Sequence, residues 1–236
     1  MAVVATLVMG ALGMAEISSA EVAVKSGEKI AFMGDSITQA GARRSGGYVK
    51  LVISGLAAND IKATMIPAGI SGHKSNQMLA RLEKDVLNKK PEWMTLSCGV
   101  NDVWHGKRGV PLDQYKENIT KIVDKCQAAG IKVMILTATM IGEDADNANN
   151  KKLAPYNAFL VELAKEKKCL LADLNAAMQA GVAKEGSGRK KGIFTGDGVH
   201  MNPAGNKMMA EGVLRGFGLD DKQIKKAQES WEKPAK

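Results

Sequence analysis

The sequence predicts an α/β protein in which a parallel sheet is covered by helices on both faces. The chain of 236 residues has the length of one ordinary domain. Apolar residues make up 45% of it, enough for a full core, and with aromatics at only 4% the aliphatic side chains and 13 methionines must fill that core. Short apolar runs alternate with segments of helical periodicity. This alternation is typical of parallel sheets, in which a helix returns the chain to the next strand.

Five segments have the short apolar pattern of strands, and helical segments separate them. Strands are expected at 29–32, 63–66, 93–97, 132–137 and 170–173. Helices are expected at 48–58, 77–87, 115–129, 153–167, 174–184 and 204–217. The third of these helices should end at Gly130, since glycine accepts the left-handed conformation that follows many helices. The charged run 220–236 is expected to be a helical basic tail with a solvated face.

The first twenty residues predict a secretory leader. An apolar run over 3–15 is too short to span a bilayer. Small residues then occupy Ser18, Ser19 and Ala20, as a signal peptidase requires, although the basic residues that usually open a leader are missing. We therefore expect a signal peptide at 1–20, a single domain at 21–236, and a secreted or periplasmic protein. A buried first strand or helix is the alternative.

Charge and cysteine content exclude several classes of protein. The formal net charge is +8, but lysines and arginines are interspersed with acidic residues and no nucleic-acid motif is present, so nucleic-acid binding is not expected. Stable membrane insertion is not expected once the leader is removed. The cysteines, Cys98, Cys126 and Cys169, lie far apart in apolar segments without zinc-ligand spacing. Neither a metal nor a cofactor is expected. We expect free buried thiols, with one disulfide among the three cysteines as the alternative.

Polar residues follow the first strand at the edge where parallel sheets place their sites. Gly34 allows a tight exit from the strand, and Ser36 then stands near the start of a helical turn. A serine there presents its hydroxyl at the sheet edge, and its own N–H can face a developing oxyanion. The alternative is a simple helix-capping serine.

Two further strand ends carry hydrogen-bond donors. The second strand is followed by a glycine-rich turn that includes Gly72, with exposed N–H groups. The third is followed by Gly99 and Asn101, and an asparagine amide there can donate to an oxyanion. The alternative for Asn101 is an Asx-turn that closes the strand.

A hydrolytic serine needs a base, and the chain has only three histidines. His200 follows Asp197 by three residues, just before Asn202 and Pro203, which are suited to start a helix. A compact loop can then bring the carboxylate to the imidazole Nδ1, leaving Nε2 for the serine. A metal-binding or capping histidine is the alternative.

The four segments GDSIT, GISG, GVND and DGVH, in this order, resemble the sequence blocks of the SGNH hydrolases, also called the GDSL esterase/lipase family. The resemblance extends from residue 29 to about residue 217. It implies a three-layer α/β/α sandwich of flavodoxin-like type. It also implies a catalytic triad and an oxyanion hole, formed by Ser36, Asp197 and His200 and by Ser36, Gly72 and Asn101.

Other residues near the strand ends are candidates for substrate binding. They are Asp35, His73, Trp104 and His105. Arg43 and Arg44 precede two glycines in a loop that suggests phosphate binding, but the spacing of a P-loop is missing.

Within the family, the motifs most resemble those of carbohydrate O-acetylesterases, which predicts a small-molecule or polysaccharide acyl ester as substrate. The loop 141–150 supports a short acyl group, because its acidic and asparagine residues would line a long acyl chain poorly and a sugar well. A lipase, lysophospholipase or thioesterase of the same family is the first alternative. A non-catalytic glycan-binding module is the second.

Overall fold

The computed structural model describes residues 21–186 and 191–232, so the expected signal peptide at 1–20 lies outside the described residues. At its centre is a parallel sheet of five strands in the order β2-β1-β3-β4-β5. The strands are β1 Lys29–Gly34, β2 Thr64–Gly69, β3 Trp93–Ser97, β4 Lys132–Leu136 and β5 Leu170–Ala172. This strand order is that of flavodoxin-like folds, and the predicted fold class is confirmed.

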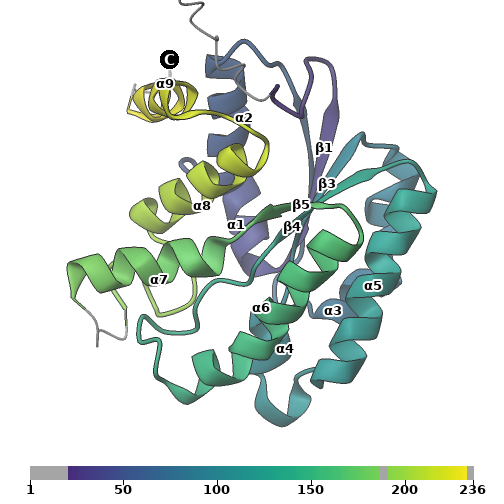
Figure 1. The fold of residues 1–236 in the computed structure, drawn as a ribbon, viewed down its shortest axis with the longest axis vertical. Helices are drawn as coiled ribbons and strands as arrows, with labels where there is room; N and C mark the ends of the chain where they lie inside the picture. Colours follow the sequence, from purple (N-terminus) through teal and green to yellow (C-terminus); the bar gives the residue numbers. More distant parts are fainter. Residues whose placement is uncertain (1–20, 187–190, 233–236) are drawn as a thin grey trace, which may run out of the picture.

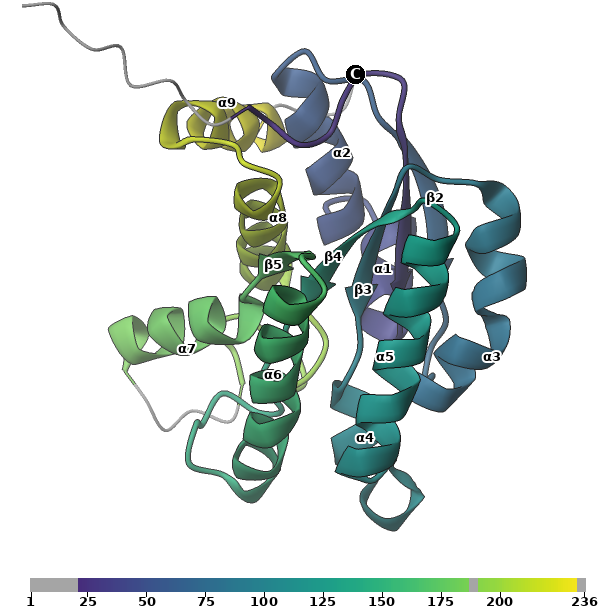
Figure 2. The same cartoon turned by 45° about the vertical axis from the view of Figure 1, so that its right-hand side comes forward.

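Helices form a layer on each face of the sheet (Figures 1 and 2). One layer contains α3, α5 and α6 with the short α4, and the other contains α1, α2 and α8, against which α7 and α9 pack. The helices are α1 Ser36–Arg43, α2 Tyr48–Ala58, α3 Ser75–Asp85, α4 Val100–Trp104, α5 Leu112–Ala128, α6 Ala148–Glu166, α7 Leu174–Glu185, α8 Pro203–Gly216 and α9 Asp221–Trp231, with 3₁₀ turns at Leu87–Lys89 and Gly106–Arg108.

The core lies between the sheet and the two helical layers. The central strands β1 and β3 are buried almost throughout, whereas the edge strand β2 is largely half-exposed. Strands covered on both faces have nearly continuous apolar sequences, which is why the short runs were recognisable. Trp93 of β3 meets Phe217 edge to face, with ring centroids 5.4 Å apart, and ties the sheet to the end of α8.

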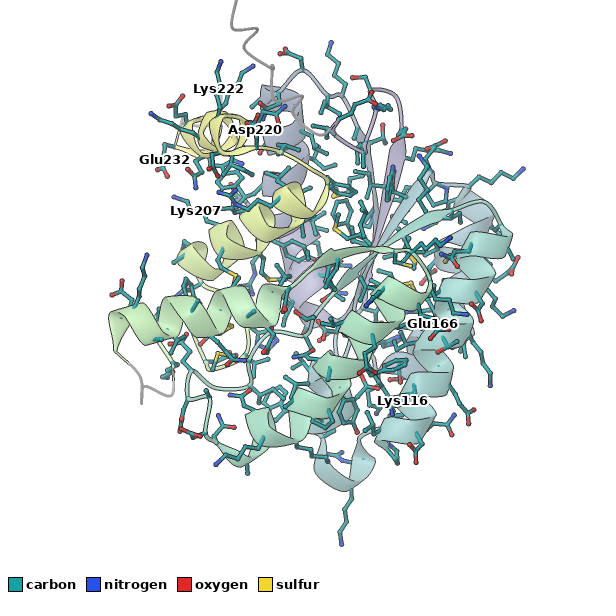
Figure 3. The ribbon with its side chains drawn as sticks, viewed as in Figure 1. Lys116, Glu166, Lys207, Asp220, Lys222 and Glu232 are labelled. Atoms are coloured by element: carbon teal, nitrogen blue, oxygen red, sulfur yellow. The ribbon has the colours of Figure 1, made fainter. Side chains whose placement is uncertain are left out.

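The basic run near the carboxyl end is a helix with one buried face. Ile224 and Ala227 are buried where α9 packs on α2, and the indole N–H of Trp231 donates to the Leu51 carbonyl at 3.0 Å. Charged residues such as Lys222 occupy the outer face (Figure 3). Up to residue 232, where the described part of this run ends, the segment is helical and solvated on one side, while its other side completes the core.

Two further features of the described residues bear on the sequence analysis. Cys98 and Cys126 are buried and Cys169 is half-buried, and none of the three forms a disulfide. Within the described ranges, no helix combines the length and the apolar character needed to cross a bilayer.

Candidate active site

Ser36 is the first residue of α1, directly after β1, and this helix begins close against the strand ends. A Cβ atom at Gly34 would lie 2.0 Å from the Thr38 hydroxyl, and one at Gly69 would lie 2.3 Å from the backbone nitrogen of Gln39. Only glycine fits at either position without moving the helix. The two strands can therefore hold the start of α1, and with it the Ser36 hydroxyl, at the carboxyl edge of the sheet.

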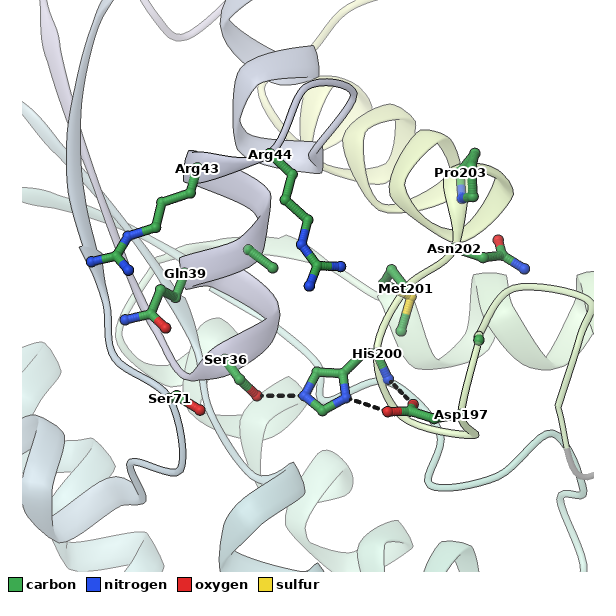
Figure 4. A pocket seen from close by; sticks show the side chains of 12 residues that line it. Ser36, Gln39, Arg43, Arg44, Ser71, Asp197, His200, Met201, Asn202 and Pro203 are labelled. Carbon is green, nitrogen blue, oxygen red and sulfur yellow. Dashed lines mark hydrogen bonds and ion pairs between the residues drawn. The ribbon is translucent and has the colours of Figure 1, made fainter.

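A chain of hydrogen bonds joins Ser36, His200 and Asp197 (Figure 4). Ser36 Oγ lies 2.9 Å from His200 Nε2, and His200 Nδ1 lies 2.6 Å from Asp197 Oδ2. The other carboxylate oxygen, Oδ1, accepts the backbone N–H groups of Val199 and His200 at 2.9 and 2.7 Å. The three residues predicted from the motifs thus lie together in the order that proton transfer from a serine requires.

The Asp197 carboxylate is held in its ionised form. Burial by itself would raise its pKa, but the hydrogen bonds from His200 and Val199 outweigh burial and lower the pKa to about 2. An ionised carboxylate at Nδ1 fixes the imidazole tautomer and can stabilise the imidazolium that forms when the serine loses its proton.

Glu143 binds the segment that leads into the loop carrying Asp197 and His200. This carboxylate is fully buried and accepts four hydrogen bonds of 2.6 to 2.7 Å, from the N–H groups of Ile193, Phe194 and Thr195 and from the Thr195 hydroxyl. Burial opposes ionisation, yet the hydrogen bonds lower the pKa of Glu143 below its ordinary value. Glu143 therefore positions the segment just before the Asp197–His200 loop.

The rest of the polar loop after β4 also has a structural role, which corrects the expectation of a sugar-lining surface. Asn150 accepts the N–H of Ile141 at 2.8 Å and donates to the carbonyls of Gly142 and Asp144. Asn147 donates to the carbonyls of Ile141 and Asp144, and its side-chain oxygen caps α6. These amides satisfy the backbone of an irregular loop, and none of the residues 141–150 lines the cavity beside Ser36.

The predicted oxyanion donors gather at the same edge. Within the described part of the chain, the backbone N–H groups of Ser36 and Gly72 donate to no other protein group. The amide nitrogen of Asn101 lies 3.1 Å from the His73 carbonyl and 3.3 Å from Asp35 Oδ2. For Asn101 to donate to an oxyanion, one of these two bonds must be shared or released, and the longer one, to Asp35, is the weaker.

None of the four candidates for substrate binding belongs to the lining of the cavity. Asp35 is buried behind Ser36, where its carboxylate caps α1 through the Ile37 N–H at 2.9 Å. Burial raises the pKa of this carboxyl to about 6. The His73 ring accepts a hydrogen bond from Arg81 Nε at 3.1 Å. Trp104, the last residue of α4, is 44% exposed, and its ring lies beside that of His105, the next residue.

Arg81 connects the strand ends to the loop that carries Gly72. Its guanidinium donates to the carbonyls of Gly34, the last residue of β1, and Ala68, the last but one of β2, and pairs with Asp85 at 2.9 Å. Because it also holds His73, the residue after Gly72, this arginine explains why His73 is not free to line the cavity.

The cavity beside the serine has a volume of about 660 Å³, and its lining includes residues that the sequence analysis missed. Its walls come from α1, from Ser71, and from the loop that leads into α8: Ser36, Gln39, Ala40, Arg43, Arg44, Ser71, Gly196, Asp197, His200, Met201, Asn202 and Pro203. Gln39 and Arg43 stand three and seven residues after Ser36, the spacing of one helical face. That spacing is the signal by which the sequence could have identified Gln39, and by which Arg43, considered only for phosphate binding, could have been placed beside Ser36. No cluster of three histidine, cysteine or acidic side chains suited to a metal ion occurs among residues 21–186 and 191–232.

Comparisons with known proteins agree with this geometry. The model of the GDSL-like lipase/acylhydrolase family matches residues 32–208. An acetylxylan esterase of Geobacillus stearothermophilus is 29% identical over 216 residues, which cover 84% of this chain and 97% of that protein.

Two solved structures share the fold. The acetyl xylan esterase AlAXEase superposes with a TM-score of 0.75 at 35% identity, covering 79% of this chain and 98% of its own. The acetylxylan esterase Axe2 of Geobacillus stearothermophilus superposes with a TM-score of 0.76 at 28% identity, covering 84% and 97%. Structures described as catalytic mutants of Axe2 replace a serine in one case and an aspartate in the other.

We predict that Glu143→Gln lowers both stability and activity. The amide can keep one acceptor oxygen, but its NH₂ group faces the Ile193 N–H, and one unsatisfied buried donor costs about 1–3 kcal/mol. The loosened loop should also lower kcat/KM for ester hydrolysis. Denaturant unfolding and kinetics would measure the two effects. Asp146→Asn, an exposed change in the same loop, is the control and should alter neither.

The stability difference between wild type and Glu143→Gln should depend on pH. A carboxyl whose folded pKa is lowered contributes stability that is present above its unfolded pKa and lost as pH falls through the folded value. The advantage of wild type should therefore shrink as pH falls below about 4. An advantage that stays constant from pH 7 to pH 3 would contradict an ionised Glu143 as the clamp of this loop.

Proposed function

Because the chain belongs to the GDSL-like lipase/acylhydrolase family, we propose that it is a serine esterase that removes acetyl groups from carbohydrates. The observation that carries the proposal is the hydrogen-bonded chain from Ser36 through His200 to Asp197 beside an open polar cavity. The names of the acetylxylan esterases that resemble it over most of their length support the acetyl group and the sugar.

The proposed reaction begins at the Ser36 hydroxyl. His200 Nε2 takes its proton while Oγ attacks the acetyl carbonyl, and Asp197 stabilises the imidazolium that results. The negative charge that develops on the carbonyl oxygen faces the N–H groups of Ser36 and Gly72, with the Asn101 amide as third donor. His200 then returns the proton to the departing sugar oxygen, leaving an acetyl group on Ser36. Water, deprotonated by His200, releases acetate in the second half of the reaction.

The cavity favours this proposal over a lipase, lysophospholipase or thioesterase. A long acyl chain contributes about 0.8 kcal/mol of binding for each methylene that it buries against apolar atoms. The lining of the cavity is mostly polar or charged, with Gln39, Arg43 and Arg44 along one wall. A long chain would gain little there, whereas hydroxyl-rich sugars would find donors. A non-catalytic glycan-binding module would have no need for the hydrogen bond between Ser36 and His200.

Export through a leader at residues 1–20 remains part of the proposal, since it would bring the enzyme to polysaccharides outside the cell.

We predict that Ser36→Ala abolishes hydrolysis of p-nitrophenyl acetate and of acetylated xylo-oligosaccharides without loss of fold. Removal of a triad nucleophile lowers the rate by at least about 10⁴-fold. Circular dichroism would verify the fold, and Ser54→Ala, on α2 away from the cavity, should retain activity. Near-normal turnover by a folded Ser36→Ala variant would refute the assignment of the nucleophile.

We also predict a clear preference for short acyl groups. Along the series of p-nitrophenyl acetate, butyrate, octanoate and palmitate, kcat/KM should be highest for the shortest esters and should fall at eight or more carbons, because the mostly polar lining of the cavity offers the added methylenes few apolar side chains. Faster hydrolysis of octanoate or palmitate than of acetate would favour a lipase or thioesterase instead.

A further inference from the structure

Two arginines of the cavity wall have no part in the proposed reaction. Arg43 is the last residue of α1, and Arg44 follows it on the turn that leads into α2. Both residues are exposed, and in Figure 4 the Arg44 side chain extends toward His200 while the Arg43 side chain lies at the other edge of α1, beside Gln39. Arg44 also lines a smaller adjoining cavity of about 210 Å³ that again includes His200.

The charge of these two arginines is not neutralised within the described part of the chain. Neither guanidinium donates a hydrogen bond or forms an ion pair there, whereas Arg81 and Arg215 both pair with carboxylates. The acidic residue in the lining is Asp197, and its two carboxylate oxygens are already bound to His200 and to backbone N–H groups. Among the described residues, the cavity therefore keeps two arginine side chains without an ion-pair partner, while its one carboxylate is engaged with His200.

The local fold fixes the backbone where the second arginine leaves the helix. The Gly47 N–H donates to the Arg44 carbonyl at 3.2 Å. Gly46, which lies between Arg44 and Gly47 in the chain, has a φ of +71°, a conformation that favours glycine. Gly47 itself packs so closely on Gly41 that a Cβ atom would lie 2.4 Å from the Gly41 carbonyl oxygen. This tight turn fixes where the backbone of Arg44 leaves α1.

We infer that Arg43 and Arg44 select an acetyl ester whose alcohol part carries a carboxylate, so that the substrate is an acetylated saccharide containing a uronic acid. This inference rests on the proposed function. Guanidinium groups match carboxylates in shape and charge, and they bind them through paired, charge-assisted hydrogen bonds. Seven residues of helix place Arg43 about 10 Å along α1 from Ser36. The carboxylate therefore belongs to the saccharide and not to the acetyl group that Ser36 attacks.

Stabilisation of the carboxyl end of α1 is the competing explanation for basic residues at this place. It predicts an effect on unfolding but none on the choice between charged and neutral substrates. Phosphate binds guanidinium groups by the same chemistry, so a phosphorylated sugar is the other possible source of the anion.

The test compares one substrate in two charge states. Acetylated oligogalacturonides would be used with free carboxyl groups and after methyl esterification, which keeps the sugars and acetyl groups but removes the charge. The measured quantity is the ratio of kcat/KM for the free acid to that for the methyl ester. Wild type should favour the free acid about three- to tenfold at low salt, and the ratio should fall with added NaCl because these charges are exposed.

Variants then assign the preference to the two arginines. Arg43→Gln and Arg44→Gln should each lower the ratio, the double variant should bring it to about one, and Arg43→Glu with Arg44→Glu should reverse it. Arg108→Gln is the matched control: an exposed arginine that lies outside both cavities, whose loss should leave the ratio unchanged. Galacturonate should inhibit wild type more strongly than inorganic phosphate does.

Several outcomes would overturn the inference: a wild-type ratio near one, a ratio that survives in the double variant, an equal loss in Arg108→Gln, or stronger inhibition by phosphate than by galacturonate. Failure of the proposed function would look different, because wild type would then release acetate neither from p-nitrophenyl acetate nor from either form of the oligosaccharide.

Discussion

The hydrogen bond between Ser36 and His200 joins segments 164 residues apart in the chain, and much of the structure serves to hold its two ends. On one side, β1 and β2 end in glycines that let α1 start directly against the sheet. On the other side, the loop that carries His200 has little regular structure of its own. Its position depends on the buried carboxylate of Glu143, which reaches it from the loop after β4. A parallel sheet brings these loops to one edge, so the fold and the site have the same origin.

One buried carboxyl group at the site, that of Asp35, lowers the stability of the fold at neutral pH. Asp35 is buried directly behind Ser36, and burial raises the pKa of its carboxyl to about 6. A buried acid with a raised pKa contributes to stability at low pH, and that contribution is lost as pH rises through about 6. At neutral pH the fold therefore tolerates an unfavourable charge. The Asp35 carboxylate also caps α1 and accepts a hydrogen bond from the Asn101 amide, the third donor proposed for the oxyanion.

Regular elements with strong apolar patterns could be predicted from the sequence, and so could the residues of the motifs. The strand Trp93–Ser97 and the helix Tyr48–Ala58 have the expected bounds, because the strand is buried throughout and the helix buries one face at regular helical spacing. The helix α1 was expected only as a single turn. Gly41 weakens its helical pattern, but a Cβ atom there would lie 2.6 Å from the Tyr48 ring, so packing requires the glycine. The helix α6 begins at Ala148, five residues earlier than expected, because Asn147 caps it inside a stretch that has the composition of a loop.

Side-chain roles that depend on distant partners could not be predicted in this way. The acidic and asparagine residues of 141–150 have the composition of a solvated surface, and nothing local indicates that Glu143 would bind the backbone 50 residues later. His73 is likewise predicted to meet a substrate, because nothing local indicates that Arg81, eight residues later, donates a hydrogen bond to its ring.

The proposed reaction requires that Ser36 is the one activated nucleophile. The most direct measurement is peptide mapping by mass spectrometry after reaction with a fluorophosphonate, which forms a stable bond only with a serine that a neighbouring base activates. We expect one adduct per chain, on Ser36, with loss of esterase activity in proportion, and much slower labelling in His200→Ala. Full loss of activity with the adduct on another residue, or an active enzyme that resists labelling, would contradict the account.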